Sequence, residues 1–92
     1  MLVTRRLRIH GRVQGVWFRG WAVDVACGLG VDGWVRNRHT GSVEILAKGD
    51  EAAVAALIER CWRGPPAARV DLVDVEATDE SAPAGFAQLP TV

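Results

Sequence analysis

The spacing of the apolar residues changes along the chain, and the order of these changes is the strongest constraint on the fold. Residues 6–11, "RLRIHG", alternate between polar and apolar, as in a strand with one buried face. From Phe18 to Leu29 the apolar residues recur every three or four positions, which predicts an amphipathic helix with Gly30 just past its end. The chain therefore begins with a strand that leads into a helix.

Two further strands follow, and after them a second helix begins. Residues 33–38, "GWVRNR", and residues 43–48, "VEILAK", predict a hairpin that turns at Thr40 and Gly41, where glycine supplies the permissive backbone. Asp50 is suited to cap a helix, because its carboxylate can accept hydrogen bonds from the first free backbone N–H groups. These features place two strands between the two helices.

The second helix precedes a fourth strand. Its apolar stripe runs from Ala53 to Cys61, and "GPP" at 64–66 ends it because proline cannot continue the helical ladder. Residues 68–77, "ARVDLVDVEA", predict a strand whose apolar positions change phase near Val73. Either a β-bulge near that residue or burial of both faces of the strand would explain the change.

The order of elements predicts the fold class. Residues 79–85, "DESAPAG", form a loop, and residues 86–89, "FAQL", form at most a short fifth strand, with Gln88 where an apolar residue is expected. The β-α-β-β-α-β order is that of a ferredoxin-like α/β sandwich, of the α+β class, with an antiparallel sheet and both helices on one face. Residues 1–92 suffice for one core and therefore one domain.

Composition narrows the classes of function. Eleven basic and eleven acidic residues balance, so the chain lacks the basic excess typical of nucleic-acid binding. No apolar run is long enough for a signal peptide or a membrane span, so we expect a cytoplasmic protein, a monomer by default. Cys27 and Cys61 form no CxxC pair, so we expect two free thiols and no metal site, with Cys61 buried on an apolar helix face.

The segment between the first strand and the first helix is a candidate anion site. It reads "GRVQGVWFRG", residues 11–20, and Gly15 permits the backbone curl that makes successive N–H groups converge at a helix N-terminus. Arg19 places a positive charge against the helix dipole, which is easiest to understand if a bound anion compensates it. Alternatively, the glycines only shape a turn and Arg19 is solvated, and glycine spacing alone favours this alternative.

A second polar residue falls where the fold brings it near this loop. Asn37 follows the apolar start of a strand, in which we expect Trp34 to lie in the core. In the β-α-β-β-α-β fold this strand can approach the first loop across the sheet. A neutral amide donates and accepts hydrogen bonds, so Asn37 can orient a water molecule. The alternative is a residue that only ends a strand before a turn. Trp17, inside the loop, either covers a substrate or rests on the core.

Together these residues resemble the acylphosphatase family. The matching blocks are "GRVQGVWFR" at 11–19, "GWVRN" at 33–37, "TGSVE" at 40–44, Gly49 before the second helix and "GPPAARV" at 64–70. The combination of GxVQGVxFR with GWVxN is far more specific than a lone glycine motif, and the resemblance covers nearly the whole chain up to residue 79. Thr40 departs from the common pattern, in which aspartate is frequent at the turn.

The resemblance implies hydrolysis of acyl phosphates to a carboxylate and inorganic phosphate, with no cofactor or metal and with a small acyl phosphate as the only partner. Arg19 matches the phosphate-binding arginine, and Asn37 matches the asparagine that positions the attacking water. The resemblance also implies that the loop backbone holds the substrate phosphate. The loop residues are Gln14, Gly15, Val16, Trp17 and Phe18. Inorganic phosphate or sulfate would bind there as product or inhibitor.

Other functions of the same fold fit less well. A metal carrier needs cysteines in the first loop, and an RNA-recognition module needs aromatic residues on its central strands, which this chain lacks. A catalytically weak module that binds phosphate or a small ligand is the alternative function. His10 and His39 are expected to be ordinary surface residues.

Overall fold

Strands and helices follow one another in the order that the apolar spacing predicts. A computed structural model describes residues 1–92. The elements are β1 (Leu2–Arg12), α1 (Phe18–Leu29), β2 (Asp32–Asn37), β3 (Val43–Asp50), α2 (Glu51–Cys61), β4 (Arg69–Ala77) and β5 (Phe86–Gln88).

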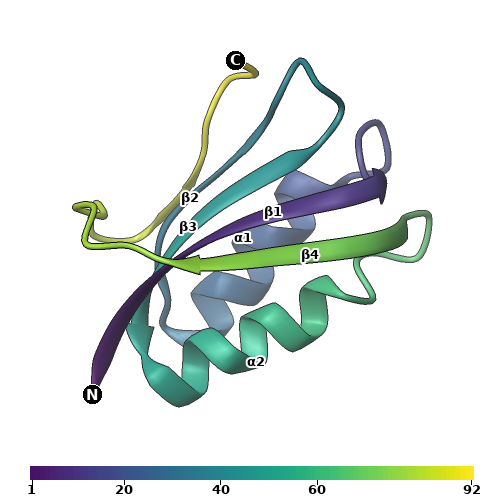
Figure 1. The fold of residues 1–92 in the computed structure, drawn as a ribbon. Helices are drawn as coiled ribbons and strands as arrows, with labels where there is room; N and C mark the ends of the chain where they lie inside the picture. Colours follow the sequence, from purple (N-terminus) through teal and green to yellow (C-terminus); the bar gives the residue numbers. More distant parts are fainter.

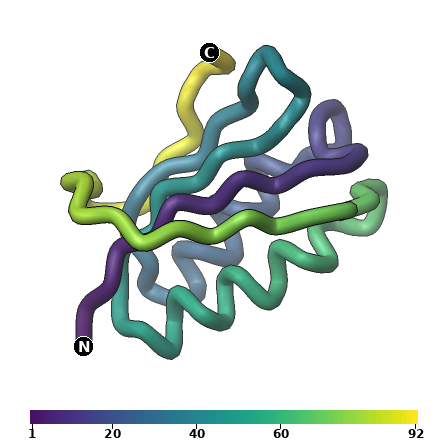
Figure 2. The backbone as a smooth tube through the Cα atoms, viewed as in Figure 1, coloured from purple at the N-terminus to yellow at the C-terminus, as the bar shows by residue number.

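The strands form one sheet in the order β4-β1-β3-β2-β5, and both helices pack on the same face (Figure 1). Strands β1 to β4 pair antiparallel, as expected, and β5 adds a parallel pair with β2, so the sheet is mixed. Strand β4 ends at the same end of the sheet at which β2 begins. The chain crosses the sheet at that end before it enters β5, so β5 runs in the same direction as β2 (Figure 2). The fifth strand is therefore real, but only the first four strands are antiparallel.

The main core lies between the sheet and the helices. It contains the residues of the predicted stripes, including Leu7, Ile45, Ala22 and Leu57, all fully buried. Both predicted helix ends are confirmed: Asp50 accepts a 3.3 Å hydrogen bond from the N–H of Ala52, and Gly30 ends α1 with a φ of 71°.

A β-bulge explains the phase change in the fourth strand. His10 on β1 faces Leu72 on β4, whereas Gly11 faces Val70, so Asp71 is the extra residue of the bulge. The bulge turns Val70 and Val73 toward the same core. A side chain at Gly11 would overlap the backbone of β4, so this glycine serves the bulge rather than the loop that follows it.

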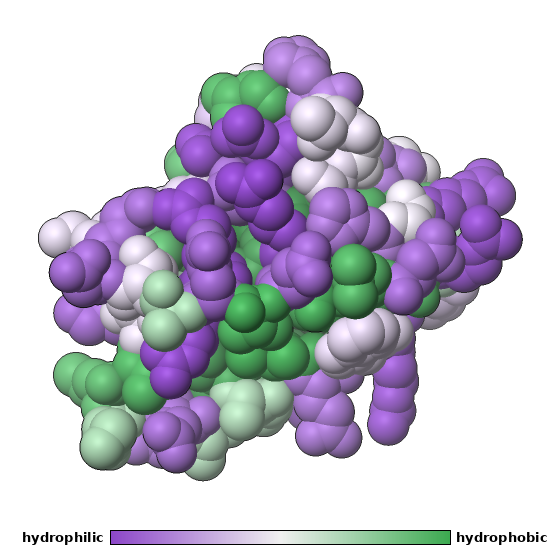
Figure 3. Space-filling view, in the orientation of Figure 1, coloured by the Kyte–Doolittle hydropathy of each residue, from purple (hydrophilic) through white to green (hydrophobic).

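The helix-free face of the sheet is built around one buried carboxylate. Glu44 on β3 is fully buried and lies within 4 Å of four arginines, of which Arg6 and Arg36 donate hydrogen bonds of 2.7 and 2.8 Å. Burial alone would raise the pKa of Glu44, but these hydrogen bonds and the positive charges of the same two arginines together outweigh it and hold the pKa below its ordinary value. Figure 3 shows hydrophilic residues over much of the visible face of the molecule, with a band of hydrophobic residues below them.

Trp34 lies on this same helix-free face and not in the main core. Its side chain is 8% exposed, and the Arg36 guanidinium lies over its ring at 4.3 Å from the centroid. Trp34 is therefore buried, as expected, but outside the main core, because Trp34 and its cross-strand partner Leu46 point to the opposite face of the sheet from Val35.

The two cysteines are free thiols, as expected. Cys27 is exposed on α1, whereas Cys61 is buried in the core, where burial raises its pKa to about 12. Neither helix has the length and apolar character needed to cross a bilayer.

Removing the Glu44 charge should destabilise the fold at neutral pH. We expect Glu44→Gln to lower the free energy of unfolding by about 1–3 kcal/mol at pH 7, less than for a fully buried pair because the arginines stay partly hydrated. A lowered folded-state pKa stabilises the fold above the ordinary value and loses this effect as pH falls through the lowered value. The gap between variant and wild type should therefore narrow below about pH 4.5.

Urea unfolding of both proteins at pH 7, 4.5 and 3 measures this gap. Glu59→Gln, at an exposed position of α2 outside every ion pair, is the matched control and should change stability little at any pH. A gap that stays constant from pH 7 to 3 would contradict the role given to Glu44.

Candidate active site

A cavity of about 120 Å³ opens where β1, β2 and α1 meet. Strands β1 and β2 are both antiparallel to β3, so they run parallel to each other and end at the same end of the sheet. Helix α1 begins there as well, after the loop that leaves β1. The lining residues are Val13, Gly15, Trp17, Phe18, Arg19, Gly20, Asn37 and Gln88.

The loop presents a run of free backbone donors. No backbone N–H from Gln14 to Gly20 donates a hydrogen bond within the protein, and the first bond of the helix runs from the Trp21 N–H to the Trp17 carbonyl. Gly15 and Trp17 have left-handed backbones, with φ of 73° and 66°. Successive N–H groups in such a curl make a concave site for an anion, and the helix dipole adds to it.

The left-handed Trp17 indicates a functional constraint. It is the only non-glycine residue with a positive φ, a conformation that costs about 1–2 kcal/mol and persists where the surroundings enforce it. The enforcement is visible on either side, because the side chains of Val16 and Phe18 are buried in the core. The two anchors leave the loop backbone facing the cavity.

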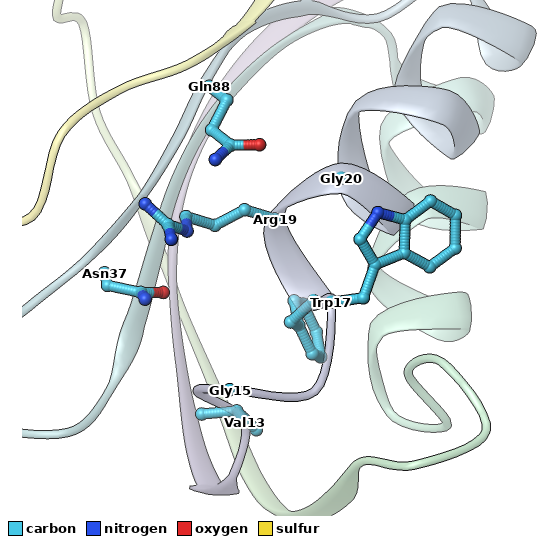
Figure 4. Close-up of a pocket in the computed structure, with 8 residues that line it drawn as sticks. Val13, Gly15, Trp17, Arg19, Gly20, Asn37 and Gln88 are labelled. Atoms are coloured by element: carbon cyan, nitrogen blue, oxygen red, sulfur yellow. The ribbon is translucent and has the colours of Figure 1, made fainter.

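The Trp17 side chain itself does not rest on the core. Its indole is 63% exposed and lies against Gly20, where a Cβ would overlap the ring nitrogen. In Figure 4 the indole extends away from Arg19 and Asn37, on the other side of the start of α1.

Arg19 and Asn37 converge on the cavity from different elements. Arg19, in the first turn of α1, extends toward Asn37 at the end of β2 (Figure 4). Arg19 is half-buried and pairs with no carboxylate, unlike the arginines around Glu44. Asn37 is 8% exposed, and its side-chain oxygen is the one buried side-chain polar atom without a hydrogen-bond partner. A free cation and an unpartnered amide are what a polar ligand would satisfy.

A side-chain clamp fixes the loop beside β2. The Gln14 amide nitrogen donates to the carbonyl oxygens of Arg38 at 2.7 Å and Ser42 at 2.9 Å, which lie in the turn after Asn37. Sequence reasoning assigned Gln14 only a backbone role and missed this clamp, since the carbonyl partners carry no side-chain signal.

Gln88 also lines the cavity, and the sequence does not indicate this role, because there Gln88 only departs from an apolar strand pattern.

The two histidines lie outside the cavity, as expected: His10 lies 3.3 Å from Asp74, and His39 is exposed.

Comparisons with known proteins show which family the chain is similar to. A family model described as Acylphosphatase matches residues 5–88. An acylphosphatase from Rhizorhabdus wittichii is 54% identical over 90 residues, which cover 98% of this chain and 91% of the relative. One from Rhodospirillum rubrum is 54% identical over 91 residues, which cover 97% and 98% of the two chains.

A solved structure of an acylphosphatase from Coxiella burnetii superposes with a TM-score of 0.92 at 33% identity, over 96% of this chain and 93% of that one. The ferredoxin-like fold, the family match and these relatives define the class of the protein. The chain belongs to the acylphosphatase family.

Loss of the Gln14 clamp should loosen the loop. We expect Gln14→Met, of similar length but without donors, to lower the free energy of unfolding by about 1–2 kcal/mol, since two hydrogen bonds are lost. Sulfate binding, followed by tryptophan fluorescence, should weaken several-fold because the donor groups are no longer held in register. Unchanged stability together with unchanged sulfate affinity would show that Gln14 positions nothing.

Proposed function

We propose that this protein is an enzyme, an acylphosphatase that hydrolyses the carboxyl–phosphate bond of a small acyl phosphate. The observation that supports this most directly is the run of free N–H donors from Gln14 to Gly20 beside Arg19 and Asn37. We further propose that it is a monomer that acts in the cytoplasm.

The loop and Arg19 bind the phosphoryl group. The N–H groups of Gln14, Gly15, Val16, Trp17 and Phe18 donate to its oxygens, and the planar guanidinium of Arg19 can grip two of them at once. These donors neutralise the charge on the equatorial oxygens without any rearrangement, because the backbone is already in place before the substrate arrives.

Asn37 orients the attacking water. Its unpartnered oxygen can accept a hydrogen bond from water while the amide nitrogen donates to the phosphoryl group. The water oxygen then bonds to phosphorus as the bond from phosphorus to the acyl oxygen breaks, and that oxygen leaves with the electron pair as a carboxylate. The proton of the water passes to the dianionic phosphoryl group and leaves with inorganic phosphate.

Such sparse equipment is sufficient for this reaction. The carboxylate is a stable leaving group, so no general acid is required, and phosphoryl transfer depends mainly on positioning and on charge neutralisation.

Arg19→Ala and Asn37→Ala should give different kinetic signatures in hydrolysis of benzoyl phosphate. Arg19→Ala should raise KM and lower kcat, with kcat/KM reduced about 10²–10³-fold, because the arginine holds the phosphoryl group in the ground and transition states. Asn37→Ala should lower kcat about 10²-fold at nearly constant KM, because water orientation matters on the way to the transition state.

Arg63→Ala, after the end of α2 and outside the active-site cavity, is the matched control and should retain activity. Equal and modest KM effects from both active-site variants would contradict the roles assigned here. A wild-type protein that phosphate protects from thermal unfolding, but that shows no turnover, would instead be the binding module.

The rate should depend little on pH or on chelator. Arg19 is the only ionisable side chain that lines the cavity, and a guanidinium keeps its charge throughout the physiological range. We expect kcat/KM to be flat between about pH 5.5 and 8 after correction for substrate ionisation, and unchanged by EDTA. A bell with a histidine-like limb, or activity lost on chelation and restored by a divalent cation, would require a different mechanism.

A further inference from the structure

One polar side chain of the cavity is not used by the proposed hydrolysis. Gln88 lies on β5, opposite Val35 of β2, and its side-chain amide makes no hydrogen bond within the protein. Residues directly opposite in a pair face the same side of the sheet, so Gln88 faces the helices, as do Val35 and Asn37. The short fifth strand therefore adds an amide to the cavity from a third element.

The position of Gln88 assigns it to one end of a bound substrate. In Figure 4 the loop at Gly15 lies at one end of the cavity and Gln88 at the other, with Arg19 and Asn37 between them. The phosphoryl group occupies the loop end, where the free N–H groups are. The acyl group of the same substrate then extends toward Gln88.

We propose that Gln88 is a specificity-determining residue that hydrogen-bonds the acyl group; the proposal rests on the proposed function. An amide offers a donor and an acceptor. The donor suits the carbonyl oxygen, which every acyl phosphate has. The acceptor suits only acyl groups with an N–H or O–H beside the carbonyl, so Gln88 favours polar acyl groups over apolar ones of the same size.

Carbamoyl phosphate and acetyl phosphate test this difference, because they have nearly the same shape and differ by an amino in place of a methyl group. The experiment measures kcat/KM for both substrates, by phosphate release, in wild type and in Gln88→Met. It also measures inhibition by inorganic phosphate. Thr91→Val removes a polar side chain from the same C-terminal segment outside the cavity and is the matched control.

We expect Gln88→Met to lower the carbamoyl-to-acetyl ratio of kcat/KM about five-fold, the effect of one modest hydrogen bond. The inhibition constant of inorganic phosphate should change less than about two-fold, since phosphate occupies only the loop end, and Thr91→Val should leave the ratio unchanged.

An unchanged ratio of kcat/KM, even if both substrates lose activity equally, would overturn the assignment of Gln88 and leave the proposed function intact. A wild-type protein that hydrolyses neither substrate would overturn the proposed function and this inference with it.

Discussion

The parallel course of β1 and β2, with β3 between them, is the constraint on which the rest of the site depends. Both strands end at the same end of the sheet, and α1 begins there because it connects them. The loop after β1 and the side chain of Asn37 therefore lie close together as a direct result of the strand order. Gln14 then fixes the remaining freedom by donating to the carbonyl oxygens of Arg38 and Ser42.

Unfavourable local features are concentrated at this one place. They are the free N–H groups of the loop, the left-handed Trp17, a cation at a helix N-terminus and the unpartnered oxygen of Asn37. Strained or unpartnered groups of this kind cost stability in a folded protein, and in the proposed function each of them is used when a phosphoryl group and a water molecule bind. The clustering is what separates a binding site from a loop that merely turns.

The opposite face of the sheet shows the contrasting arrangement, in which a buried charge is fully partnered. Glu44 is held by arginines that include Arg36 and Arg38, the two neighbours of Asn37 in the chain. Because alternate residues of a strand face opposite sides, this network contacts β2 on the face of the sheet opposite the cavity. The ion pairs on one face thus help to hold the Asn37 amide on the other.

Apolar spacing and backbone chemistry are local properties, and the sequence by itself determined whatever follows from them. The helices, the cap at Asp50, the bulge as one of two options, and the candidate roles of Arg19, Gly15 and Asn37 were all predicted in this way. The direction of β5, the side of the sheet on which Trp34 lies, the Gln14 clamp and the place of Gln88 were decided only by tertiary structure. Each depends on which strands become neighbours, and that depends on contacts between residues far apart in the chain.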